Sequence, residues 1–137
     1  MQTQNFSNRY VQAARIALGL IYFIFGLNFF LHFIPGSGQP GGRAAAFLGG
    51  IFQSGYLFPL IKVIEVISGA LLILGYFTPL ILVILMPITL NILLFHTVLA
   101  AGGFPTGLSI FMMLAHIFLA WSYREQYRHL FIAKPAL

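Results

Sequence analysis

The chain has 137 residues, of which 60% are hydrophobic and only 7% are charged. A soluble domain contains about 45–50% apolar and about 25% charged residues, so this composition excludes a soluble domain and predicts an integral membrane protein in contact with the lipid bilayer. The net charge of +5 comes from scattered basic residues that form no nucleic-acid-binding stripe, and the absence of cysteine excludes disulfides, thiolate nucleophiles and Cys-ligated clusters.

The first predicted element is a membrane-spanning helix over about residues 14–33. Its apolar part, Ile16–Phe33, is longer than a signal-peptide core of about 7–15 residues and has no small-x-small cleavage site after it, so we expect it to be retained. Proline and glycine dominate residues 35–42 and predict a loop. Residues 44–53 are too few to span a bilayer but have apolar positions at helical spacing, which predicts a short interfacial or re-entrant helix.

Three further spanning helices are predicted over about residues 59–76, 80–100 and 106–123. Pro59 suits the first turn of its helix, whereas Pro87 lies inside the third span and is expected to kink it. At about 20 residues per span, the chain has room for four spans and for no large extramembrane domain. We therefore expect residues 1–137 to form a single all-α membrane domain, a four-helix bundle with a short extra helix in the first loop.

The distribution of basic residues predicts the orientation of the bundle. Most of them flank the first and last spans: Arg9, Arg15, Arg124, Arg128 and Lys134. By the positive-inside rule, four spans then place the N-terminus and the C-terminus on the cytoplasmic side of the membrane, which we expect to be the bacterial inner membrane. The same bases can attract anionic lipid headgroups.

Polar side chains inside the spans are the candidate functional groups, because each is costly in hydrocarbon. Glu65 is the leading candidate, as a catalytic proton carrier, and Lys62 can form an ion pair with it from three residues earlier. The alternative is that this pair is purely structural. The candidate ligand-binding residues are Asn28, His32, Asn91, His96 and His116. At about 1.5 Å per residue, His116 lies near the middle of the bilayer and most of the others lie in its outer half.

The histidines near the outer edge admit three interpretations. His32 and His96 could bind a ligand such as a quinone carbonyl, act as axial ligands of haem b, or be interfacial histidines without a ligand. Haem b is disfavoured because no spacing indicates a porphyrin cavity, and no metal site is predicted because HxxxH and ExxH motifs are absent. Asn28 is expected to share a helix face with His32, whereas Asn91 and His96 share one only if the Pro87 kink or a bulge alters the winding.

A pattern of short segments extends along nearly the whole chain. These segments are Arg15–Leu20, Phe25–Asn28, His32–Phe33, Ser54–Leu60, Glu65–Gly75, Pro87, Asn91, Phe95–His96 and Ala120–Arg124. Together they resemble the DoxX-like family of small four-helix membrane proteins. The most recognisable segment is Glu65–Gly75, in which an acidic residue precedes a Leu-rich stretch with small residues.

The resemblance implies a redox-associated membrane function, because the family is named for a subunit associated with thiosulfate:quinone oxidoreductase. By position, Glu65 matches the family's intramembrane acid, and Asn28, Asn91 and His96 match polar positions. We therefore expect a quinone-linked membrane subunit that depends on a membrane or periplasmic oxidoreductase partner. The alternative is a noncatalytic scaffold or assembly factor for a partner complex. A small transporter is a third interpretation, which would require oligomerisation.

Overall fold

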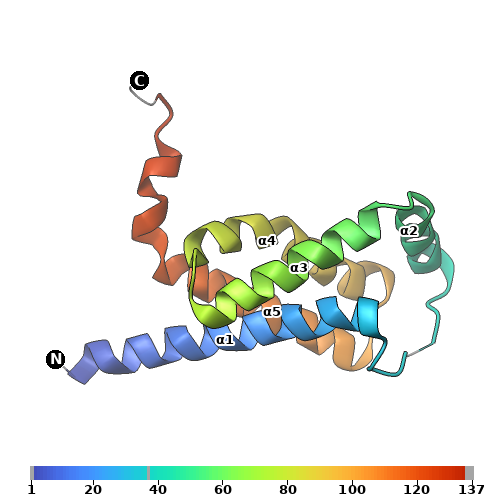
Figure 1. Ribbon diagram of the computed structural model, residues 1–137, viewed down its shortest axis with the longest axis horizontal. Helices are drawn as coiled ribbons and strands as arrows, with labels where there is room; N and C mark the ends of the chain where they lie inside the picture. The colour runs from blue at the N-terminus through green and yellow to red at the C-terminus, as the bar shows by residue number, and fades with distance from the viewer. Residues whose placement is uncertain (1, 37, 135–137) are drawn as a thin grey trace.

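The computed structural model describes residues 2–36 and 38–134, which form seven helical elements (Figure 1). In chain order these are α1 (Gln2–Leu31), α2 (Gly42–Gln53), α3 (Leu57–Leu74), α4 (Thr78–Leu94), the π-helical turn η1 (Phe95–Leu99), α5 (Gly103–Ser122) and the 3₁₀ helix η2 (Arg124–Phe131). No β-strand occurs within this described part of the chain. The predicted all-α membrane fold is confirmed.

Four helical segments are long and apolar enough to cross a membrane. They are Asn8–Leu31, Leu57–Leu74, Thr78–Leu99 and Gly103–Ser122. A helix satisfies its backbone hydrogen bonds internally, as hydrocarbon demands, and the exposed faces of these helices are rich in Leu, Ile, Val and Phe. The chain is thus an integral membrane protein whose surface contacts lipid. The start of α1 and the helix η2 lie at one end of the bundle, here called the terminal end, and α2 lies at the other, here called the α2 end (Figure 1).

Helix α1 extends beyond the membrane on its N-terminal side. It begins at Gln2 and has 30 residues. At 1.5 Å per residue such a helix is about 45 Å long, whereas the hydrocarbon core of a bilayer is about 30 Å thick. The residues ahead of the spanning part are mostly polar, so hydropathy marks the start of the span rather than the start of the helix.

Close contact between α1 and α3 depends on glycine. A β-carbon at Gly69 of α3 would lie 2.6 Å from the backbone nitrogen of Phe23 and 2.7 Å from the carbonyl oxygen of Gly19 on α1. A β-carbon at Gly26 would lie 3.2 Å from the β-carbon of Glu65. Small residues let transmembrane backbones approach in this way. The contact presses the helix segment that carries Glu65 against α1.

Helix α3 ends at the terminal end with a glycine and a cation. Gly75 adopts a φ of 82°, and its N–H donates to the carbonyl of Leu71 at 2.9 Å. The guanidinium of Arg15, from α1, donates to the carbonyls of Leu72 and Ile73. A cation in this position adds hydrogen bonds to carbonyls of the last helical turn and interacts favourably with the helix dipole. Arg15 therefore helps to set the height of α3 relative to α1.

Helix α4 contains Pro87 and continues into the π-helical turn η1. Proline cannot donate to the carbonyl four residues earlier, so α4 lacks one internal hydrogen bond in its interior. In η1 the Ala100 N–H donates to the Phe95 carbonyl at 2.8 Å, five residues back. A π-turn rotates less per residue than an α-helix does. Asn91 and His96 line the same cavity although they are five residues apart.

Helix α2 is the short extra helix that the sequence predicts in the first loop. It packs beside the start of α3 and beside η1, at the α2 end of the bundle (Figure 1). Phe47, Leu48 and Ile51 are partly buried on its bundle-facing side, whereas Phe52 is 53% exposed. Helix α2 therefore covers the end of the bundle rather than crossing the membrane.

Candidate functional site

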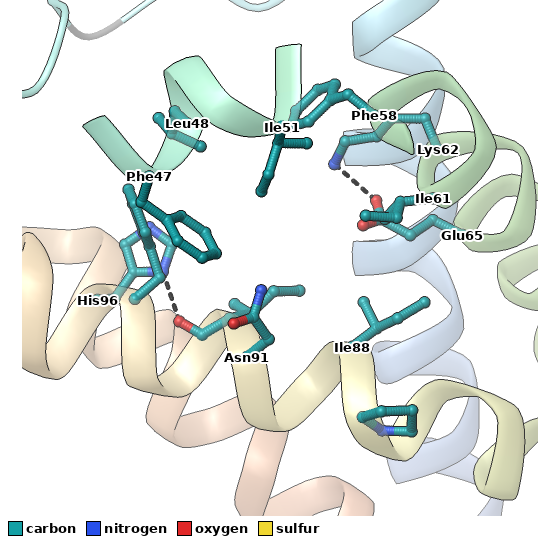
Figure 2. Close-up of a pocket in the computed structure, with 13 residues that line it drawn as sticks. Phe47, Leu48, Ile51, Phe58, Ile61, Lys62, Glu65, Ile88, Asn91 and His96 are labelled. Atoms are coloured by element: carbon teal, nitrogen blue, oxygen red, sulfur yellow. Dashed lines mark hydrogen bonds and ion pairs between the residues drawn. The ribbon is translucent and has the colours of Figure 1, made fainter. Parts of the chain in front are cut away.

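A cavity of about 340 Å³ lies at the α2 end, between α2, α3, α4 and η1 (Figure 2). Its lining residues are Phe47, Leu48, Ile51, Phe58, Ile61, Lys62, Glu65, Pro87, Ile88, Asn91, Ile92, Phe95 and His96. Most of the lining is therefore apolar. The polar side chains come from Lys62, Glu65, Asn91 and His96, all of them candidates from the sequence, and the fold places all four around this one cavity.

One wall of the cavity carries an ion pair. Lys62 Nζ donates to Glu65 Oε2 at 2.8 Å, and the two residues lie three apart on α3. The Glu65 side chain is only 3% exposed. A buried carboxylate is costly unless a cation or hydrogen-bond donor accompanies it, and Lys62 supplies both. The Lys62 ammonium also lies 5.3 Å from the centre of the Phe58 ring, which adds a cation–π contact.

The opposite side of the cavity carries an imidazole. His96 Nδ1 bonds to the carbonyl of Ile92 at 2.9 Å. A carbonyl can only accept, so Nδ1 carries the proton, and Nε2 of the neutral ring is left as an acceptor. Figure 2 shows Asn91 between His96 on one side and the Lys62–Glu65 pair on the other. The cavity thus has polar groups at two opposite sides, with an amide between them.

Aromatic and aliphatic side chains form the remaining walls. Phe47 from α2 and Phe95 from η1 have ring centroids 5.8 Å apart. Ile51 enters the cavity from α2 and Ile88 enters it from α4, on the opposite side (Figure 2). A mostly apolar lining with a few polar groups is typical of small-molecule sites in proteins.

The structure does not bring Asn28 and His32 into this cavity. The Asn28 Oδ1 accepts a hydrogen bond from the backbone N–H of Ile34 at 2.7 Å, so the amide caps the end of α1. His32 lies one residue beyond α1, with a φ of 52°, and its side chain is exposed. The expected shared helix face of Asn28 and His32 requires the helix to continue through His32, and it ends at Leu31. His32 and His96 therefore do not face each other across the cavity as an axial pair would.

His116 lies outside the cavity, in the interior of the bundle, where it is 1% exposed. Its Nε2 donates to the carbonyl of Leu82 at 2.9 Å, and its Nδ1 lies 2.9 Å from the hydroxyl oxygen of Thr89. The two contacts are with residues of α4 that lie before and after Pro87. His116 therefore connects α5 to α4 on both sides of the proline. Both ring nitrogens are used by the protein, and neither is free for a ligand in the cavity.

A tyrosine and a threonine that the sequence analysis did not single out complete this network. The hydroxyls of Tyr22 and Thr89 hydrogen-bond to each other, and they are 1% and 0% exposed. The network therefore links α1, α4 and α5 through buried polar groups. A hydroxyl in an apolar span is a weak signal by itself, because its one proton can go to a carbonyl of its own helix. For Thr89 the carbonyl of Leu85, at 2.9 Å, competes with His116 Nδ1 for that proton.

The described residues hold no group of three or more His, Cys, Asp or Glu side chains that could bind a metal ion. Among the residues that line the cavity, Glu65 carries the carboxyl group and His96 the imidazole. Glu65 offers a carboxylate held by an ammonium, and His96 offers an imidazole acceptor. The two groups belong to different helices, so their separation depends on the packing of α3 against α4 and η1.

Comparison with known proteins assigns the family. The DoxX family model matches residues 10–98, which run from α1 to η1 and include every residue that lines the cavity. No curated protein and no solved structure shows significant similarity to the chain. The match covers more than half of the chain, and it agrees with the four apolar spanning helices. The chain therefore belongs to the DoxX family of membrane proteins.

Proposed function

We propose that the chain is a quinone-linked, redox-associated membrane subunit and that its cavity holds a quinone headgroup. The observation that carries the proposal is the arrangement of the cavity: apolar walls on two faces, and polar groups at two opposite sides. A para-quinone is a flat ring with one oxygen at each end, so its shape and polarity match this arrangement. Its apolar tail would reach lipid, which surrounds the bundle.

The polar residues suggest how protons would be handled. A bound quinone would take up two electrons, which a partner protein must supply, and two protons, and would leave as a quinol. Glu65 and His96 stand at opposite sides of the cavity, so during reduction each would first take up a proton from water and then pass it to one oxygen of the ring. In the reverse direction the carboxylate of Glu65 and the Nε2 of His96 would accept the two hydroxyl protons. The ammonium of Lys62 would stabilise the carboxylate form of Glu65 before it takes up a proton and after it has released one.

The neutral form of His96 favours one redox state of the ligand. Because Nδ1 donates to the Ile92 carbonyl, Nε2 can accept from a hydroxyl but cannot donate to a carbonyl until the ring is protonated. The cavity with neutral His96 should therefore bind a quinol better than the corresponding quinone.

Ligand binding by purified protein tests the proposal. The wild type and its variants are placed in lipid nanodiscs with a short-tailed benzoquinol, and bound ligand is counted by extraction and mass spectrometry. We expect about one ligand per wild-type chain and at least a tenfold loss of affinity in Glu65→Gln and in His96→Gln. The matched control is His32→Gln, which makes the same substitution outside the cavity and should bind like the wild type.

The opposite result supports the alternative function. If the wild type binds no quinol or quinone above the level dissolved in the lipid, the quinone proposal is wrong. If a partner complex then copurifies equally with the wild type, Glu65→Gln and His96→Gln, the protein acts as a noncatalytic scaffold or assembly factor.

A further inference from the structure

The segment after α5 presents a distinctive surface at the terminal end of the bundle. Helix η2 runs across the direction of α1 instead of continuing along it (Figure 1). Because spanning helices run roughly along the bilayer normal, a segment that crosses their direction at the end of a span extends along the membrane surface. In a bilayer whose normal follows the spanning helices, residues 124–134 would lie along the membrane surface.

The charge of this surface is positive. Arg124, Arg128 and Lys134 are all exposed. The only acidic residue nearby is Glu125, which is exposed and lies 3.5 Å from Arg128. Arg9 is also exposed at this end. The guanidinium of Arg15, in contrast, bonds to carbonyls at the end of α3. The basic side chains of the C-terminal segment therefore exceed its acidic ones and remain available to an anion.

Large apolar side chains accompany these charges. Leu130 is 69% exposed, Phe131 is 83% exposed and Ile132 is 51% exposed. Trp121, in the last turn of α5, is 69% exposed. Exposed aromatic and aliphatic groups beside basic groups are typical of segments that lie in a membrane interface, where the apolar groups enter the acyl region and the bases stay among the headgroups.

Two contacts hold the segment in place. The Tyr127 hydroxyl donates to the carbonyl of Pro79, at the start of α4, at 2.9 Å. The Arg124 guanidinium lies 5.0 Å from the centre of the Trp121 ring and donates to the Trp121 carbonyl at 3.0 Å. The basic and apolar groups are therefore presented from a segment attached to the bundle rather than from a free tail.

We propose that this surface binds the headgroups of anionic phospholipids in the leaflet at the terminal end. The surface consists of Trp121, Arg124, Arg128, Leu130, Phe131 and Lys134, and is called the C-terminal lipid surface below. An anionic leaflet attracts the basic side chains of this surface. The exposed apolar side chains need a partner that has hydrocarbon directly beneath its charged groups. A phospholipid with a net negative headgroup meets both requirements. The proposal is independent of what the cavity binds.

Trp121 provides a built-in probe, because it is the only tryptophan in the chain. The full-length protein is reconstituted into vesicles of equal parts phosphatidylcholine and phosphatidylglycerol. In one preparation only the phosphatidylglycerol carries bromine in its acyl chains, and in the other only the phosphatidylcholine does. Bromine quenches tryptophan fluorescence on contact, so the ratio of the two quenching efficiencies reports which lipid lies next to Trp121. We expect the ratio to favour phosphatidylglycerol at least about threefold in the wild type at low salt.

Variants test whether the basic side chains cause the lipid preference without altering the surroundings of Trp121. Arg128→Gln with Lys134→Gln leaves Arg124, which touches the Trp121 ring, unchanged, and should bring the ratio close to one. Arg43→Gln removes an exposed basic side chain at the α2 end and should leave the ratio as in the wild type. High salt should also lower the wild-type ratio, because screening weakens the attraction between exposed charges. Equal quenching by both lipids in the wild type, or a ratio that survives the double substitution, would overturn the proposal.

Discussion

Replacing Thr89 with valine tests the buried network that braces α4. Valine keeps the branched shape of threonine, so the substitution removes a hydroxyl without opening a cavity. That hydroxyl bonds to the Tyr22 hydroxyl, and it lies 2.9 Å from Nδ1 of His116. Both partners are 1% exposed, so water cannot replace the lost bonds. Each hydrogen bond between transmembrane helices contributes about 0.6 kcal/mol on average and at most about 1.7 kcal/mol, so losing two should lower the free energy of unfolding by about 1–3 kcal/mol.

The assay is reversible unfolding in mixed detergent and lipid micelles, with Thr97→Val as the matched control. Thr97 is exposed, and its hydroxyl bonds to the carbonyl of Leu93, four residues earlier, at 2.7 Å, so its substitution should change the free energy by no more than about 0.5 kcal/mol. A double-mutant cycle of Thr89→Val with Tyr22→Phe should give a coupling energy of about 0.6–1.7 kcal/mol. Equal effects of Thr89→Val and Thr97→Val, or a coupling energy near zero, would refute the network as a source of stability.

Two further predictions concern helix packing and the attachment of η2. Gly69→Ala should lower the free energy of unfolding by about 3 kcal/mol, because its new methyl group would lie 2.6 Å from the backbone of Phe23, whereas Gly107→Ala has nothing within 4 Å and should be nearly neutral in the same unfolding assay. Burial raises the pKa of the Tyr127 phenol above its ordinary value of 10.0, so its contact with Pro79 is complete below pH 10.0 and is lost as the pH rises through the raised pKa. The difference in phenolate absorbance between the wild type and Tyr127→Phe should have its midpoint above pH 10.0, and a midpoint at or below that value would contradict the assignment.

The sequence alone determines the fold class and one half of the candidate site. In lipid the backbone must bond to itself, so a chain with four long apolar stretches and Pro–Gly interruptions has little alternative to spanning helices. The pairing of Lys62 with Glu65 is equally local, because residues three apart on a regular helix are neighbours whatever else the chain does. Residue spacing no longer predicts a shared face where the helix ends. This is the case for Asn28 and His32, because α1 ends at Leu31.

Tertiary structure decides which polar residues meet. Asn91 and His96 join Glu65 only because α4 packs against α3 and passes into η1, and no spacing along one helix encodes that arrangement. His116 has an imidazole that could bind a ligand, but both of its ring nitrogens contact groups of α4 inside the bundle. A single polar residue in an apolar helix can bond to another helix, to its own backbone or to a ligand at similar cost. The choice depends on the rotation and height of each helix relative to its neighbours, which are properties of the packed bundle.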